Sequence, residues 1–365
     1  MNNMKKRTGI LLTVIVFGFL SPAFALEGES IVFNPKTGNY VITYKKEDDG
    51  TFRKITYIPA TKINPTLKSQ IKLDNKGEIH YGYTLISGKD SQQNIVHVIL
   101  DPISSVKTPL PDIPLDTPPS HAPVDIPAMR KLADDMDKAS KYLEIPAHWE
   151  GSLTYSRGQK AFRIGWSTEE MPNGMHPGGR AVFGLNSRDL PGIIQVKIEG
   201  IATDSQDMPG EQAPNIDDGG FGTQYFKLVM NDFVPRNAAV PAIAVPTPFN
   251  AAILLERIQT QLHTWIGMKL LDSTFSSQLD RYFAAASTAF LHNQPKAGKE
   301  HIETLRKMLK KEHEDADKDD EKEDGKYEGN SDDKTKRILI DRLAARVLDF
   351  NLKYVLKRVE GKDKD

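Results

Sequence analysis

Two histidines, His80 and His97, lie on neighbouring segments that the sequence predicts to be β-strands. If residues 78–86 and 94–100 pair as an antiparallel hairpin, their apolar positions share one face and His80 lies opposite His97. A structural or catalytic zinc ion needs at least three protein ligands, and no third ligand follows at a fixed spacing. Two interpretations therefore stay open. The pair either binds a metal ion or lies unliganded on the solvent face of a sheet.

An acidic stretch near the carboxyl end has a partial calcium-loop pattern. Asp315, Asp317 and Asp319 follow the i, i+2, i+4 spacing of calcium ligands. The sixth position should be glycine but is Asp320, so the stretch is not an EF-hand. The alternatives are weak calcium binding and a solvated acidic spacer. We expect no cofactor, with weakly bound calcium as the alternative.

A second acidic segment, residues 201–222, includes Asp217 and Asp218. Weak calcium binding is one hypothesis for these acids, and general acid/base catalysis in an extracellular hydrolase is another. The chain has no G-x-S-x-G elbow, no H-E-x-x-H motif, no Walker loop and no dinucleotide fingerprint. We therefore assign no catalytic residue, and the sequence favours a non-catalytic protein.

Three aromatic residues, Trp149, Tyr155 and Trp166, lie near one predicted hairpin. Exposed aromatic rings on a sheet can stack on sugars or anchor a protein partner. The same residue types also fill cores. The sequence leaves both a binding surface and a core role open for them.

Composition limits the classes to which this protein can belong. The 365 residues are 39% hydrophobic and 27% charged, with 48 basic and 49 acidic residues and a formal net charge of -1. These values exclude a collagen-like fibre, a wholly disordered chain and a chain-wide basic field for nucleic acid. There is no cysteine, which excludes disulfides and thiolate metal sites. A chain of this length is expected to form two domains.

The first 25 residues have the layout of a secretory signal peptide. A basic segment at 5–7 precedes an apolar run at 10–20 and the small-residue pattern Ala23-Phe24-Ala25. The run is shorter than the ~20 apolar residues that a membrane span needs. We expect bacterial export to the periplasm or the medium, with cleavage after Ala25 and no membrane span afterwards. An uncleaved anchor is the alternative.

Residues 26–232 are predicted to form one antiparallel β-sandwich domain. Apolar residues alternate with polar ones over 79–85, and turn residues recur about every ten positions, as in half-buried strands. A proline-rich and helical insertion, residues 101–146, interrupts the strands. The expected fold is therefore multidomain, with a sandwich and an inserted helix in its first part.

Proline spacing predicts a boundary after the sandwich. Residues 233–248 contain four prolines, which forbid a continuous helix and favour an extended linker. Residues 249–360 then carry apolar residues at helical spacing and predict a small helical bundle with its own core. Acids dominate residues 312–336, for which we expect a disordered loop inside the bundle.

Two resemblances accompany these patterns. The helical part resembles the FIMAH-type module of secreted bacterial proteins, which implies a helical accessory domain without catalytic residues. The first part is similar to Ig-like sandwiches of exported bacterial proteins and brings no site residues. The FIMAH-type features are Leu270-Leu271, Leu279, Tyr282-Phe283, Ala286, Pro295 to Ala297, Ile302 and Leu305, and the Ig-like features are Tyr81-Gly82-Tyr83 and Leu190-Pro191-Gly192.

Taken together, the sequence favours an exported binding or structural protein without catalytic activity. Its expected partner is a protein or glycan of the cell envelope or extracellular space, and no nucleic acid is expected. An extracellular hydrolase using the acids of residues 201–222 is the first alternative. A weakly calcium-binding, adhesion-type protein is the second.

Overall fold

The computed structural model describes residues 28–46, 50–105, 142–156, 161–168, 174–201, 221–320 and 339–361. The predicted signal peptide, the inserted helix, Asp217 and Asp218 lie outside these ranges. The chain divides into two compact units, one formed by residues 1–59 with 203–231 and the other by residues 60–202 with 232–365. Within the described ranges, no helix has both the length and the apolar character of a membrane span.

The described residues of the smaller unit form a three-stranded antiparallel sheet and one helix. Its elements are β1 (Ser30–Asn34), β2 (Asn39–Lys45), β3 (Phe52–Tyr57) and α2 (Phe221–Met230). Ile42, Tyr44 and Tyr57 share one sheet face and pack with Phe221 of α2. The strands pair only with one another among the described residues. The prediction of one sandwich domain over 26–232 is corrected here, since its first strands form a sheet of their own.

The larger unit contains two antiparallel sheets, which confirms the predicted antiparallel β structure. Their strand orders are β11-β10-β6-β8-β7 and β4-β5-β9. Tyr83 of the second sheet lies 6.0 Å from Trp166 of the first between ring centroids, so the sheets face each other across apolar side chains. The strands are β4 (Pro65–Leu73), β5 (Ile79–Ser87), β6 (Ile95–Ile103), β7 (Trp149–Ser156), β8 (Ala161–Thr168), β9 (Arg180–Ser187), β10 (Leu190–Gly200) and β11 (Val234–Ile243).

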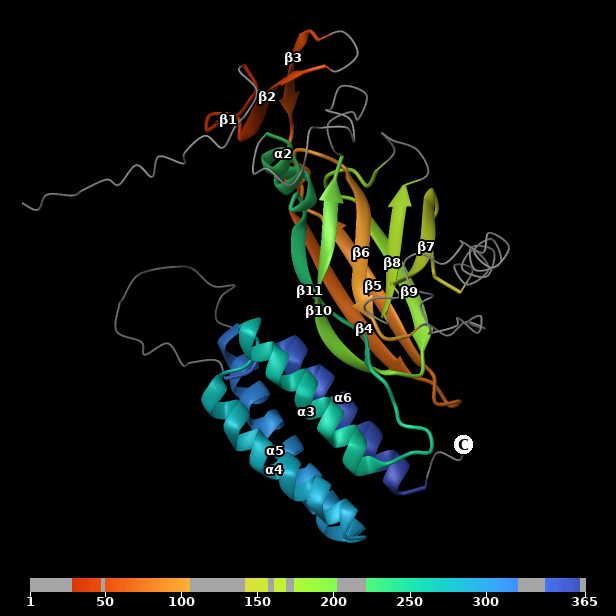
Figure 1. Cartoon of the computed structure of the whole chain (residues 1–365). Coiled ribbons are helices and arrows are strands. Elements are labelled where there is room, and N and C mark those ends of the chain that lie inside the picture. The colour runs from red at the N-terminus through yellow and green to blue at the C-terminus, as the bar shows by residue number, and fades with distance from the viewer. Residues whose placement is uncertain are drawn as a thin grey trace, which may run out of the picture. The chain divides into compact units, whose positions relative to one another are not determined.

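The predicted linker at residues 233–248 is wrong, because most of it is strand β11. This strand pairs along its length with β10, and the two lie side by side in Figure 1. β11 is the edge strand of its sheet, so only one side of its backbone needs hydrogen-bond donors. Pro235 and Pro241 are tolerated there for that reason. Proline spacing excludes a helix and a central strand, but it does not exclude an edge strand.

In the described part of the larger unit, four helices accompany the sheets: α3 (Ala251–Gly267), α4 (Ser273–Leu291), α5 (Pro295–Asp320) and α6 (Arg342–Val359). Successive helices contact each other, and α6 returns to contact α3. Asn250, Asp272 and Asp341 cap α3, α4 and α6 by accepting hydrogen bonds from backbone N–H groups of the first turn. Because α5 extends to Asp320, the predicted disordered loop is wrong for residues 312–320, and residues 321–336 lie outside the described part.

The helices share their core with the sheets. α3 and α6 both contact β11, and α6 also contacts β10. The Asn351 side chain of α6 is fully buried, and its Nδ2 donates a hydrogen bond to the carbonyl of Pro191 in β10, at 2.9 Å. A Cβ atom at Gly192 would lie 2.8 Å from the Gln261 side chain of α3, so the absent side chain permits this close packing. The predicted separate core of the helical part is therefore corrected to one continuous core.

Candidate functional site

The predicted pairing of His80 with His97 is wrong. β5 pairs with β4 and β9, whereas β6 pairs with β10 and β8 in the facing sheet. The Nδ1 atom of His80 lies 3.1 Å from Asn186, and that of His97 lies 3.0 Å from Glu199 Oε2. Apolar alternation shows which face of a strand is buried, but it does not show which strand lies beside it. The predicted hairpin pairing was wrong for this reason. Among the described residues, no three metal-ligating side chains come together.

The predicted aromatic binding surface is also wrong for its two tryptophans. Trp149 is 8% exposed and Trp166 is 1% exposed. Their ring centroids lie 5.0 Å and 5.2 Å from that of Phe183, which places both rings in the core. Tyr155 lies in β7, and its side chain is outside the described part of the structure.

The acidic candidates are only partly described. Asp315, Asp317 and Asp319 lie on the last turns of α5, where the backbone is helical and does not form a calcium loop. Their side chains, like the whole of Asp217 and Asp218, are outside the described part. Calcium binding and acid/base catalysis by these residues therefore stay predictions.

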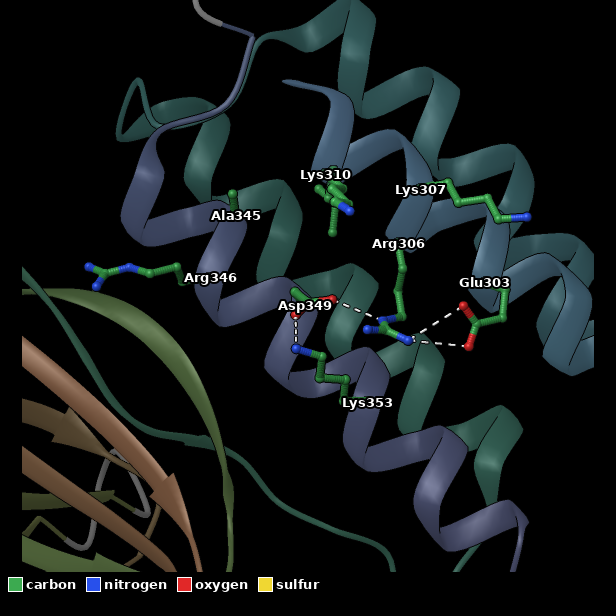
Figure 2. A pocket seen from close by; sticks show the side chains of 9 residues that line it. Glu303, Arg306, Lys307, Lys310, Ala345, Arg346, Asp349 and Lys353 are labelled. Atoms are coloured by element: carbon green, nitrogen blue, oxygen red, sulfur yellow. Dashed lines mark hydrogen bonds and ion pairs between the residues drawn. The ribbon is translucent and has the colours of Figure 1, made fainter. Parts of the chain in front are cut away.

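A pocket of about 440 Å³ opens between α5 and α6. Figure 2 shows its charged side chains projecting from the two neighbouring helices. Five basic and two acidic side chains line it, which gives the lining a net charge of +3. The lining residues are Glu303, Arg306, Lys307, Leu309 and Lys310 of α5, with Ala345, Arg346, Asp349 and Lys353 of α6.

Helical spacing explains why these charges gather. Residues three or four positions apart lie on the same face of a helix. This relation holds for Arg306 and Lys310 on α5, and for Arg346, Asp349 and Lys353 on α6. Beside these charges, α5 is buried through Ile302, Leu305 and Leu309, which fix the helix against its neighbours. Core packing thus turns the charged faces of both helices toward the same pocket.

Both acids of the pocket are held by its cations. The Nε atom of Arg306 lies 2.9 Å from Asp349 Oδ1, and its Nη1 atom lies 3.2 Å from Glu303 Oε1. Lys353 Nζ donates to Asp349 Oδ2 at 2.6 Å. Asp349 therefore bridges Arg306 and Lys353, and these contacts appear as dashed lines in Figure 2.

The ion pairs change how Arg306 and Asp349 titrate. Burial alone would raise the pKa of the Asp349 carboxyl, but hydrogen bonds from Lys353 and Arg306 outweigh burial and lower it. Burial alone would lower the pKa of Arg306, but its bonds to Asp349 and Glu303 raise it. Both groups are therefore held in their charged forms at neutral pH.

The lowered pKa of Asp349 predicts a pH dependence of stability. Its unfolded pKa is about 3.9, so the stabilisation is complete well above that pH and is lost as pH falls through the lower folded value. Partial exposure limits the effect to about 1 kcal/mol. Urea unfolding of the native protein and of Asp349→Asn should differ most at pH 7 and converge toward pH 2. An equal difference at both pH values would contradict this assignment.

Two cations of the pocket are left without a counter-charge. Within the described residues, neither the Lys307 side chain nor the Arg346 side chain forms a hydrogen bond or an ion pair. Figure 2 shows their side chains extending to opposite sides of the Arg306–Asp349 pair. The described residues therefore leave the charges of Lys307 and Arg346 without a counter-charge and open to an approaching anionic ligand.

Comparisons with known proteins do not assign the pocket. No family model, no curated protein and no solved structure matches this chain. The resemblance to FIMAH-type modules stays a prediction. The function of the pocket must therefore be argued from its own chemistry.

Sequence reasoning missed this site because no local motif marks it. The ion pair between Arg306 and Asp349 joins residues 43 positions apart. The only local signal is the run of basic residues on the polar face of α5, which includes Arg306, Lys307 and Lys310. That signal alone does not distinguish a site from a solvated helix face.

Proposed function

We propose that this protein is an exported, non-catalytic binding protein that holds an anionic ligand between α5 and α6. The observation that carries the proposal is the charge balance of the pocket. Its two acids already contact Arg306 and Lys353, while Lys307 and Arg346 have no partner among the described residues. An anionic ligand would supply the missing counter-charge.

The ion-pair network supports this proposal by preparing the site. Asp349 fixes the positions of Arg306 and Lys353 before any ligand arrives. The planar guanidinium of Arg306 is partly used by Glu303 and Asp349, so the two unpaired cations are the first contacts for a ligand.

The proposal also covers the localisation of the protein and the fold of its larger unit. The signal-peptide pattern of residues 1–25 supports export to the periplasm or the extracellular space. The two facing sheets are proposed to form an Ig-like sandwich, and α3 to α6 a small bundle of FIMAH type. In this arrangement the sheets hold α3 and α6, while α5 and the outer side of α6 are left to bind a glycan or protein of the envelope.

The proposal is tested by removing each unpaired cation in turn. Lys307→Ala and Arg346→Ala should each weaken binding of an anionic probe about threefold, because an exposed charge contact contributes about 0.6 kcal/mol. Isothermal titration with linear polyphosphate at low salt measures the change. Lys296→Ala removes one positive charge from α5 outside the pocket and should leave the affinity unchanged. Absence of binding, or equal losses in all three variants, would refute the proposed site.

A further inference from the structure

The cations of the pocket are spread along the helices and do not converge on one point. Arg346 and Lys353 are seven positions apart on α6, which corresponds to about 10 Å along the helix axis. Lys307 and Arg346 extend to opposite sides of the central ion pair in Figure 2. A compact anion such as phosphate cannot contact both ends of this array. An extended chain of negative charges can contact both.

The centre of the pocket also disfavours a compact anion. Tight phosphate sites converge several donors on one anion, often with backbone N–H groups. Here the carboxylate of Asp349 already occupies the space between Arg306 and Lys353. A ligand therefore has to pass over this occupied centre and bind the flanking cations. That geometry fits a chain laid across the two helices.

The uncharged lining residues indicate what kind of polymer the ligand is. Among the described residues that line the pocket, Leu309 and Ala345 are apolar and none carries an aromatic ring. Proteins that bind single-stranded nucleic acids stack bases on aromatic side chains, and such a surface is missing from this lining. The described part of the lining therefore offers contacts to charges along a polymer backbone and no aromatic surface for bases.

We infer that the ligand is an extended linear polyanion without bases, such as a phosphate- or sulfate-bearing polymer, which binds across α5 and α6. This inference rests on the proposed function and adds the class of ligand. The polymer neutralises Lys307 and Arg346 at the same time. Its binding releases counterions, so affinity falls steeply as salt concentration rises.

A chain-length series with the full-length protein tests the inference. Inorganic phosphate, tripolyphosphate and long-chain polyphosphate are titrated in the same buffer, with dextran sulfate and uncharged dextran as the saccharide pair. We expect affinity per phosphate group to rise at least tenfold from phosphate to the long chain, and dextran sulfate to bind while dextran does not. In Arg346→Ala, the slope of log K against log salt should fall by about one for the long chain.

The outcomes separate this inference from the proposed function. If phosphate binds as tightly per group as the long chain and Arg346→Ala weakens both, the anion site stands and the extended ligand is refuted. If a single-stranded oligonucleotide of matched charge binds more tightly than polyphosphate, the base-free polymer is refuted in favour of nucleic acid. If no probe binds, the proposed function fails together with the inference.

Discussion

A Val240→Asp substitution is expected to unfold the helices of the larger unit together with its sheets. Val240 lies in β11, is 0% exposed, and belongs to the core that the sheets share with α3 and α6. A carboxylate without a partner at such a position costs more than about 4 kcal/mol, which is a large part of the roughly 5–15 kcal/mol that stabilises a domain. If the core is continuous, this loss of stability destabilises every helix and strand that packs against the core.

Two tryptophans make the outcome measurable in both parts. Trp166 reports on β8 and Trp265 on α3, and each is 1% exposed in the native structure. In Val240→Asp, we expect both fluorescence signals to shift to those of solvated indole and the helical circular dichroism to fall in the same transition. Single-tryptophan versions, with Phe at the other positions, separate the two signals.

A matched control is available in the other sheet of the larger unit. Val182 of β9 is 49% exposed, so Val182→Asp makes the same chemical change on a solvent face and should alter stability by less than about 0.5 kcal/mol. A Val240→Asp protein with native helical signal and a buried Trp265 would show that the helices fold independently. The boundary that the prolines predicted would then separate two parts that are each stable without the other.

Local patterns predicted much of the secondary structure. The alternation over residues 79–85 corresponds to β5, in which Ile79, Tyr81, Tyr83 and Leu85 are all buried. The apolar stripe of α3 likewise holds Leu254, Ile258, Leu262 and Trp265 in the core. These predictions succeeded because alternation and helical spacing are properties of a single segment.

The wrong predictions concern which segments contact one another in the fold. β5 and β6 were expected to pair, but they face each other from opposite sheets. β11 was expected to be a linker, because its prolines hide the fact that Ala238, Ala239 and Val240 are buried. Choice of partner depends on contacts between distant positions, which one sequence does not display. The pocket was missed for the same reason, since it exists only where α5 meets α6.

The Asp349→Asn substitution should change stability and anion binding in opposite directions. Asp349 bridges Arg306 and Lys353, so its removal weakens the contact between α5 and α6 by about 1 kcal/mol at pH 7. The same change frees Lys353, leaves Arg306 paired only with Glu303, and raises the net charge of the pocket by one unit. We expect the affinity for long-chain polyphosphate to rise about tenfold, equivalent to about 1.4 kcal/mol.

This pair of effects distinguishes a binding site from a structural ion-pair cluster. Glu300→Gln makes the same acid-to-amide change on an exposed part of α5 outside the pocket lining, and it should leave both the urea midpoint and the affinity unchanged. If Asp349→Asn lowers stability without raising affinity, Asp349 serves only to hold α5 against α6. If affinity rises equally in Glu300→Gln, the gain comes from overall charge and the pocket has no special role. Only a gain confined to Asp349→Asn assigns the anion to the space between these two helices.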